Sequence, residues 1–72
     1  SGLVIHNGRL FVSDNGTGEI IAYSLETGAE LNRMETNAGS IMGINMGPEG
    51  KIWFVDAQRN QVVRIDPDES DD

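Results

Sequence analysis

The sequence predicts an all-β protein made of two antiparallel meanders, and two observations lead to this prediction. The first is an internal repeat: residues 8–28 align with residues 50–70 without a gap, which gives a period of 42 residues. The second is local: "GRLFVSD" (8–14) and "GKIWFVD" (50–56) are short apolar runs, each opened by Gly and closed by Asp. Runs rich in β-branched and aromatic residues between turn residues are typical of strands, and these are too short for buried helices.

The aligned positions keep their chemical character, and upstream "GLVIHNG" (2–8) also aligns with "GINMGPEG" (43–50) after a one-residue gap. A period near 42 is that of a four-stranded propeller blade or of a helical solenoid repeat. Nearly continuous apolar strands favour blades, because stacked blades cover both faces of a sheet. The structural repeat positions are Gly8 with Gly50, Phe11 with Trp53 and Asp14 with Asp56.

Four strands are predicted in the first repeat, which spans about residues 2–36. Asn7-Gly8 suits the tight primed turn of a hairpin, and Ile21, Tyr23 and Leu25 would share one face of the third strand. The predicted strands are Leu3–His6, Arg9–Asp14, Glu19–Leu25 and residues 29–36.

The segment 29–36 ("AELNRMET") has two possible structures. Its residues are good helix formers, and Leu31 and Met34 would share a helical face. The repeat instead requires an outer strand there. We expect a strand, because tertiary context commonly overrides intrinsic propensity.

The second repeat spans about residues 41–67 and lacks a counterpart of the segment 29–36. Its predicted strands are Ile41–Met46, Lys51–Asp56 and Gln61–Asp66, and an acidic tail follows at residues 68–72. Because propellers typically use four to eight blades, two blades predict a part of a larger propeller, or a chain that oligomerises into one. Residues 61–66 would form an exposed outer edge strand, which invites pairing with another chain.

Composition narrows the possible partners. The chain has 72 residues, 12 acidic and 5 basic side chains, a net charge of −7 and no cysteine. Disulfides and zinc–thiolate sites are excluded, and a domain this small usually needs another source of stability, such as a partner subunit. The acidic charge disfavours binding to nucleic acid and to anionic membranes. The expected partners are other blades or copies of the chain itself.

The repeated phrases resemble known propeller families. "GINMGPEGKIWFVDAQRNQVVRIDP" (43–67) resembles a repeat of the streptogramin lyase type, and "GRLFVSDNGTGEIIAYSLETG" (8–28) is similar to NHL-repeat or gluconolactonase-type blades. The resemblance implies a β-propeller and covers most of the chain. In the enzymes of these families, several blades supply the site at the mouth of the central channel. The lyase relies on His, Glu and magnesium, whereas the only histidine here, His6, lies outside the lyase-like repeat.

Several polar and aromatic side chains are candidates for a catalytic, metal-binding or ligand-binding site. Asp14 and Asp56 could form a carboxylate pair, but aspartates at these positions more often accept hydrogen bonds from the following turn. His6 has no serine and carboxylate arranged around it as a catalytic triad requires, and we interpret it as a turn residue. Trp53 and Phe54 could stack on a ligand, but mid-strand positions favour the core between blades. No catalytic, cofactor-binding or metal-binding residue follows from the sequence.

Three functions remain open. The favoured hypothesis is a non-catalytic structural or binding segment that closes a ring with other blades or copies. The second is a fragment of a propeller enzyme, a lactone hydrolase or streptogramin lyase-like protein, in which Asn45 is the best candidate for a ligand contact in the channel. The third is a protein-interaction module with an open sheet edge, formed by Gln61, Val62, Val63, Arg64 and Ile65.

Overall fold

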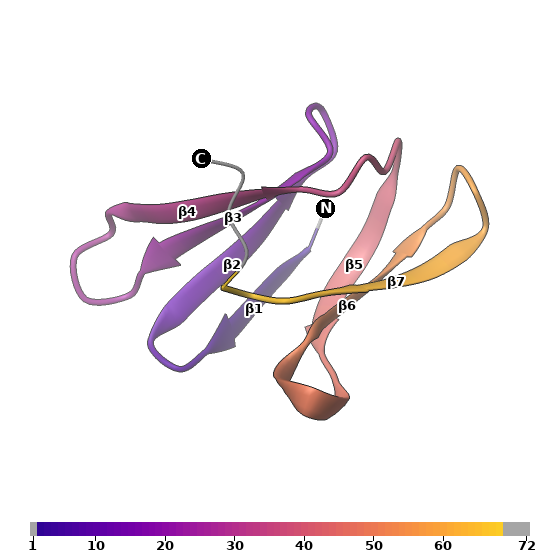
Figure 1. Ribbon diagram of the computed structural model, residues 1–72. Coiled ribbons are helices and arrows are strands. Elements are labelled where there is room, and N and C mark those ends of the chain that lie inside the picture. The colour runs from indigo at the N-terminus through magenta and orange to yellow at the C-terminus, as the bar shows by residue number, and fades with distance from the viewer. Residues whose placement is uncertain (1, 69–72) are drawn as a thin grey trace.

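The computed structural model describes residues 2–68, and it is an all-β structure with two separate antiparallel sheets. Strands that are adjacent in sequence pair with each other in both sheets (Figure 1). The first sheet contains β1 (Leu3–His6), β2 (Arg9–Asp14), β3 (Glu19–Ser24) and β4 (Glu30–Glu35). The second sheet contains β5 (Ile41–Met46), β6 (Ile52–Asp56) and β7 (Gln61–Ile65). The predicted all-β meanders are therefore confirmed.

The two sheets have the same register. Each residue pair between β2 and β3, from Leu10–Tyr23 to Asp14–Glu19, recurs between β6 and β7 with both partners shifted by 42 residues. The preceding hairpins also agree, since Val4 pairs with Phe11 as Asn45 pairs with Trp53. The repeat in the sequence is thus a repeat in backbone pairing.

Segment 29–36, which was ambiguous in sequence, contains strand β4 and no helix. Met34 pairs with Ile20 of β3, and only 1% of its surface is exposed. Packing of this side chain accounts for the outcome, because burial against a neighbouring strand outweighs the weak helix propensity of a short segment.

Three strands are one residue shorter than predicted, because a turn begins inside the expected strand, and β4 is one residue shorter at each end than the predicted 29–36. β3 ends at Ser24, whose Oγ accepts hydrogen bonds from the amides of Glu26 and Thr27 at 3.2 Å each. β7 ends before Asp66, which accepts a 2.9 Å bond from the amide of residue 68. Lys51 precedes β6, and its amide bonds to the carbonyl of residue 48.

The Asn7-Gly8 turn has the predicted primed geometry, with φ of 51° and 76°. Positive φ at both central residues matches the twist of a two-residue hairpin. Gly50 occupies the equivalent position in the second sheet with φ of 68°, at the end of a short 3-10 turn (Pro48–Gly50). Gly8 and Gly50 therefore both supply the positive φ that their turns require.

The hydrophobic core lies between one face of each sheet. β5 packs beside β1 and β2, so the first strands of the two sheets are neighbours (Figure 1). The amide of Ile41 donates a 3.0 Å hydrogen bond to Asn15 Oδ1, which ties the second sheet to the β2–β3 turn. The core side chains are Phe11, Ile20, Ala22, Met34, Ala38, Ile41, Ile52 and Phe54.

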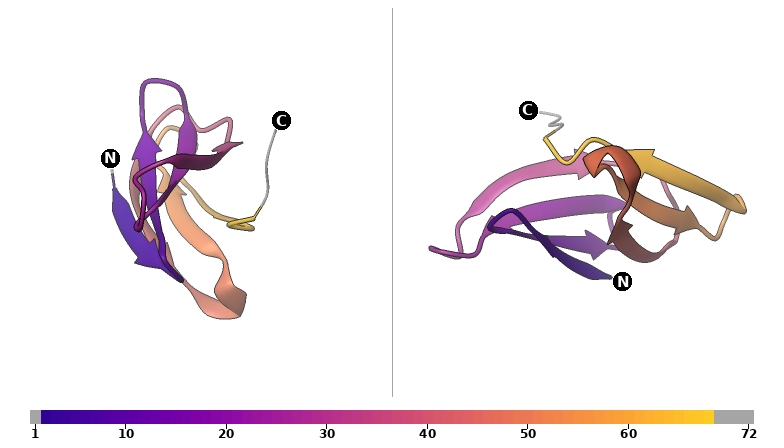
Figure 2. Two further views of the ribbon diagram at one scale, coloured as in Figure 1. Left: turned by 90° about the vertical axis from the view of Figure 1, so that its left-hand side faces the viewer. Right: turned by 90° about the horizontal axis from the view of Figure 1, so that it is seen from below.

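The chain after β7 returns to the first sheet. Figure 2 shows this segment extending back across the molecule. Arg9 Nη1 of β2 donates to Asp68 Oδ1 at 2.8 Å and lies 3.4 Å from the carbonyl oxygen of Pro67. Pro67 is buried there. Of the predicted acidic tail, only Asp68 lies within the described residues.

Candidate functional site

The two repeat aspartates form turns, as the sequence predicts. Asp14 Oδ1 accepts a 2.8 Å hydrogen bond from the amide of Gly16. Asp56 Oδ1 accepts bonds from the amides of Gln58 (3.1 Å) and Arg59 (3.4 Å), and its side chain is almost completely buried. Both carboxylates therefore accept hydrogen bonds from the backbone of the turn that follows them.

His6 lies next to the first turn, and its Nε2 is 3.1 Å from the side-chain Nδ2 of Asn7. Nothing in this contact links the imidazole to a serine or a carboxylate. Within residues 2–68, no group of three or more His, Cys, Asp or Glu side chains could hold a metal ion.

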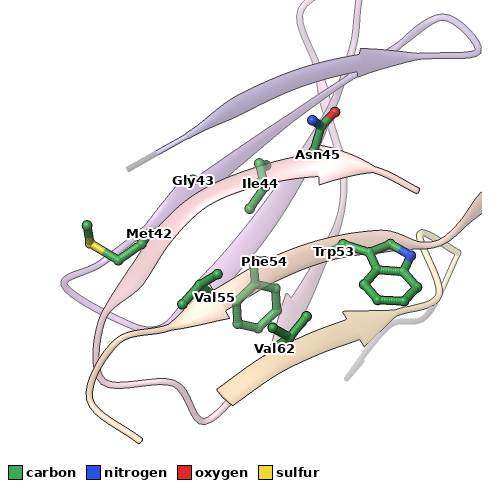
Figure 3. Close-up of a pocket in the computed structure, with 8 residues that line it drawn as sticks. All are labelled: Met42, Gly43, Ile44, Asn45, Trp53, Phe54, Val55 and Val62. Atoms are coloured by element: carbon green, nitrogen blue, oxygen red, sulfur yellow. The ribbon is translucent and has the colours of Figure 1, made fainter. Parts of the chain in front are cut away.

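The candidate site is an apolar groove on the face of the second sheet that points away from the core. Strand pairing places six side chains on this surface, which we call the second-sheet free face: Met42, Asn45, Trp53, Val55, Val62 and Arg64. A cavity of about 310 Å³ opens on it, and Figure 3 shows that its lining comes from β5, β6 and β7. Met42, Val55 and Val62 are exposed, so most of this lining is apolar and accessible to solvent.

Trp53 and Phe54, both expected in the core between blades, lie on opposite faces of β6. Phe54 belongs to the core with 2% of its surface exposed. Trp53 points the other way, because successive side chains alternate across a strand, and Arg64 lies over its ring at 5.8 Å. Trp53 Nε1 is enclosed without a hydrogen-bond partner among the described residues. The indole is thus part of the candidate site.

Asn45 lies at the edge of the groove. It belongs to β5, pairs with Trp53 and is exposed. A β-bulge between Met42 and Ile44 shifts the register just before it. The amide therefore faces solvent on the free face.

A second cavity, of about 440 Å³, lies at one end of the second sheet. It is lined by Glu49, Lys51, Arg64, Ile65 and Asp66. Arg64 Nη1 lies 3.9 Å from a Glu49 carboxylate oxygen. Among residues 2–68, no carboxylate lies within ion-pair distance of Lys51. This end of the sheet therefore offers an ammonium group beside a hollow.

The first sheet also has a face that points away from the core. Strand pairing places Leu3, Ile5, Leu10, Val12, Ile21 and Tyr23 on it, and we call it the first-sheet free face. Leu3 and Ile5 are 62% and 58% exposed. The sequence contained a signal for this surface, since apolar residues occupy both faces of each strand, but it did not show which face would stay uncovered.

The margin of the first-sheet free face carries an ion-pair network. Arg33 bonds to both carboxylate oxygens of Glu30 at 2.8 and 2.9 Å and to Glu19 at 2.9 Å. Hydrogen bonding to Arg33, offset by some desolvation and reinforced by its charge, holds the pKa of Glu30 below its usual range. The hydrogen bond and charge of Glu30 likewise raise the pKa of Arg33.

β7 is the last strand of the second sheet, which has the order β5-β6-β7. Its equivalent in the first sheet, β3, is paired on both sides because β4 is present. Within residues 2–68, no strand pairs with the outer side of β7. The predicted edge, residues 61–65, is therefore open in the described part of the chain.

Comparison with known proteins places this chain in no family. Within residues 2–68 the structure contains no helix long and apolar enough to cross a membrane. No protein-family model, no curated protein and no solved structure matches the chain.

Proposed function

We propose that this chain is a non-catalytic structural or binding segment of a β-propeller. Its two sheets are successive blades, and they close a ring with other blades or with other copies of the chain. The observation that carries the proposal is the common register of the two sheets, together with their packing face to face around one core. A unit that repeats in this way cannot cover its outermost faces by itself, and it needs neighbours.

The pattern of exposure supports this proposal. Val62 is 67% exposed, whereas its counterpart Ile20 is completely buried at the junction of the sheets. Leu3 and Ile5 are exposed, and their counterparts Ile44 and Met46 pack against the core. Positions that are exposed on one sheet are thus covered on the other, which is the arrangement of an incomplete stack.

Size-exclusion chromatography with light scattering tests the proposal. We expect the isolated chain to form a defined oligomer at micromolar concentration, or to be poorly folded when it is diluted to a monomer. Since propellers typically have four to eight blades, two to four copies would suffice. A well-folded monomer that persists at millimolar concentration would contradict the proposal.

The open edge of β7 favours a second candidate function, a module that accepts a strand from a partner. The exposed backbone groups would pair with that strand between Val62 and Ile65. Hydrogen exchange at increasing protein concentration provides the test. Protection of these amides should increase with concentration, and unchanged exchange in a chain shown to be assembled would exclude this use of the edge.

The position of Asn45 in the groove favours a third candidate, a fragment of a propeller lactone hydrolase or lyase whose other blades supply most of the site. Assays of a longer parent chain against lactones, with and without a divalent metal, would test it. Activity that survives Asn45→Ala would remove this amide from the site.

A further inference from the structure

The chain carries both halves of one more junction of the kind that it already contains. The second-sheet free face lies at the positions where the first sheet contributes to the core, with Trp53 at the position of Phe11 and Val62 at that of Ile20. The first-sheet free face lies at the positions where the second sheet contributes, with Val12 at the position of Phe54. In their strand positions, the two free faces therefore correspond to the two faces that meet in the core.

The contact of residues 66–68 with the first sheet shows how the end of such a junction is sealed. Pro67 is buried, and Asp68 pairs with Arg9 at 2.8 Å. The turn that presents them is fixed by Asp66, whose carboxylate accepts the amide hydrogen of Asp68.

The same turn occurs in the first sheet, 42 residues earlier. Ser24 stands at the position of Asp66, and its Oγ accepts the amide hydrogen of Glu26, two residues on. Here Leu25 replaces Pro67 and is 49% exposed. The Glu26 side chain makes no ion pair in the part of the chain that the structure describes. The turn is thus formed as in the second sheet, but the residue at the Pro67 position stays half exposed.

The counterpart of Arg9 is Lys51, on the second sheet. Lys51 borders the cavity of about 440 Å³ and has no carboxylate within ion-pair distance among the described residues. A carboxylate from outside would find the Lys51 ammonium group there, and the Arg64 guanidinium and the carboxylates of Glu49 and Asp66 also line the cavity wall. The two charges of the internal junction thus have counterparts in Glu26, which follows β3 of the first sheet, and Lys51, which precedes β6 of the second.

We propose that the second-sheet free face of one copy binds the first-sheet free face of a second copy, with Glu26 of the second copy paired to Lys51 of the first and Leu25 covered as Pro67 is. This inference rests on the proposed function and names the partner and the contact. The two surfaces differ, so the interface is heterologous, and successive copies close into a ring or extend as a filament.

Two residues depart from the equivalence: Asn45 stands at the position of Val4, which packs against the core, and Arg64 stands where Ala22 is buried. Its guanidinium lies over Trp53 and reaches toward Glu49, at the end of the sheet. A long arginine stem can cover apolar surface while its charged end stays near solvent. The apolar groove around Val55 and Val62 therefore remains available to the second copy.

Two variants that block one face each provide the test. Leu3→Asp with Ile5→Asp blocks the first-sheet free face, and Val55→Asp with Val62→Asp blocks the second. All four side chains are exposed, and circular dichroism would verify that both variants fold. In sedimentation velocity, we expect each variant alone to be monomeric and their mixture to form a 1:1 dimer, because only one interface remains intact.

The outcomes separate this inference from the proposed function. If the wild-type chain assembles and one blocked variant still dimerises alone, the interface joins identical faces and the inference is wrong, while a role in a ring or scaffold stands. The inference is equally wrong if the mixture stays monomeric although the wild type assembles. A wild type that is a stable monomer at all concentrations would overturn both.

A charge exchange tests the ion pair. Glu26→Lys and Lys51→Glu should each weaken assembly about five- to tenfold, since a pair at a partly exposed interface contributes up to about 1 kcal/mol and like charges add repulsion. A chain with both substitutions should regain most of the affinity. Arg59→Glu, on an exposed turn of the second sheet, is the matched control and should change assembly less than twofold. A double variant as weak as the single ones would show that Glu26 and Lys51 do not meet.

Discussion

Side chains at equivalent strand positions are buried at the junction between the two sheets and exposed on the two free faces. At the junction, Phe11 and Ile20 have no exposed surface, whereas their counterparts Trp53 and Val62 lie on a face open to solvent. The pairing of the backbone is the same in both places. Burial in this molecule is therefore decided by the presence of a neighbouring sheet and not by the strand that carries the side chain.

The largest expected difference is between Phe11→Ala and Trp53→Ala. Removing a fully buried aromatic ring costs about 3–5 kcal/mol. For so small a domain, a loss of this size would leave most of the molecules unfolded. Trp53 is only partly buried, so its removal should cost less than half as much in the monomer. Urea unfolding followed by circular dichroism at low protein concentration measures both, and equal losses would contradict the asymmetry of the two faces.

A smaller difference is expected between the repeat aspartates. Asp56 is buried and accepts two amide hydrogen bonds, so Asp56→Ala should destabilise the fold by about 1–3 kcal/mol through the loss of both bonds to a charged, buried acceptor. Asp14 is only partly buried and accepts one, and Asp14→Ala should cost about 0.5–1.5 kcal/mol. Asparagine variants keep an oxygen acceptor and serve as controls. A larger loss at Asp14 would reverse the expected order.

The turns should show no asymmetry at all. Gly8 and Gly50 both have positive φ, and no atom would contact an added Cβ within 4 Å. Gly8→Ala and Gly50→Ala should therefore each cost about 1–2 kcal/mol through backbone strain alone. Thermal unfolding of the two variants measures this. Unequal losses at the two positions would mean that the turns are not equivalent.

The smallest effect concerns the ion pair on the first sheet, which has no counterpart among the described residues of the second. Because the folded-state pKa of Glu30 is lowered by Arg33, the pair stabilises the fold above the ordinary glutamate pKa of about 4.3. This contribution is lost as the pH falls through the lower folded-state pKa. Glu30→Gln should thus destabilise the chain slightly at pH 7 and not at all at strongly acidic pH. Unfolding curves at the two pH values, with and without high salt, test this prediction, and a loss that persists in acid would contradict it.

Much of the backbone follows from the sequence. The repeat predicted all seven strands to within one residue at each end, because turn residues such as Asn7-Gly8 and short apolar runs between them act locally. β3 and β7 end early because the side chains of Ser24 and Asp66 accept hydrogen bonds from the amides of the turns that follow. Composition alone does not show whether such a residue begins a turn or continues a strand.

The candidate site could be predicted only in part. The strand periodicity placed Trp53 and Phe54 on opposite faces, but both faces of β6 are apolar, so periodicity could not tell which would join the core. No motif or spacing in the sequence distinguishes Lys51 and Glu26, since single exposed charges are common on any surface. Only the tertiary contact between Arg9 and Asp68, which stand at the equivalent positions, indicates that they can pair.

The sequence by itself determined the repeat, the strands and their turns, because these depend on interactions among residues close along the chain. Tertiary structure decided the rest. It converted the helix-prone segment 29–36 into a strand through burial of Met34, and it chose which face of each sheet is covered. That choice depends on the packing of one sheet on another, between residues far apart in the sequence, and this packing leaves one apolar face of each sheet open in the described residues.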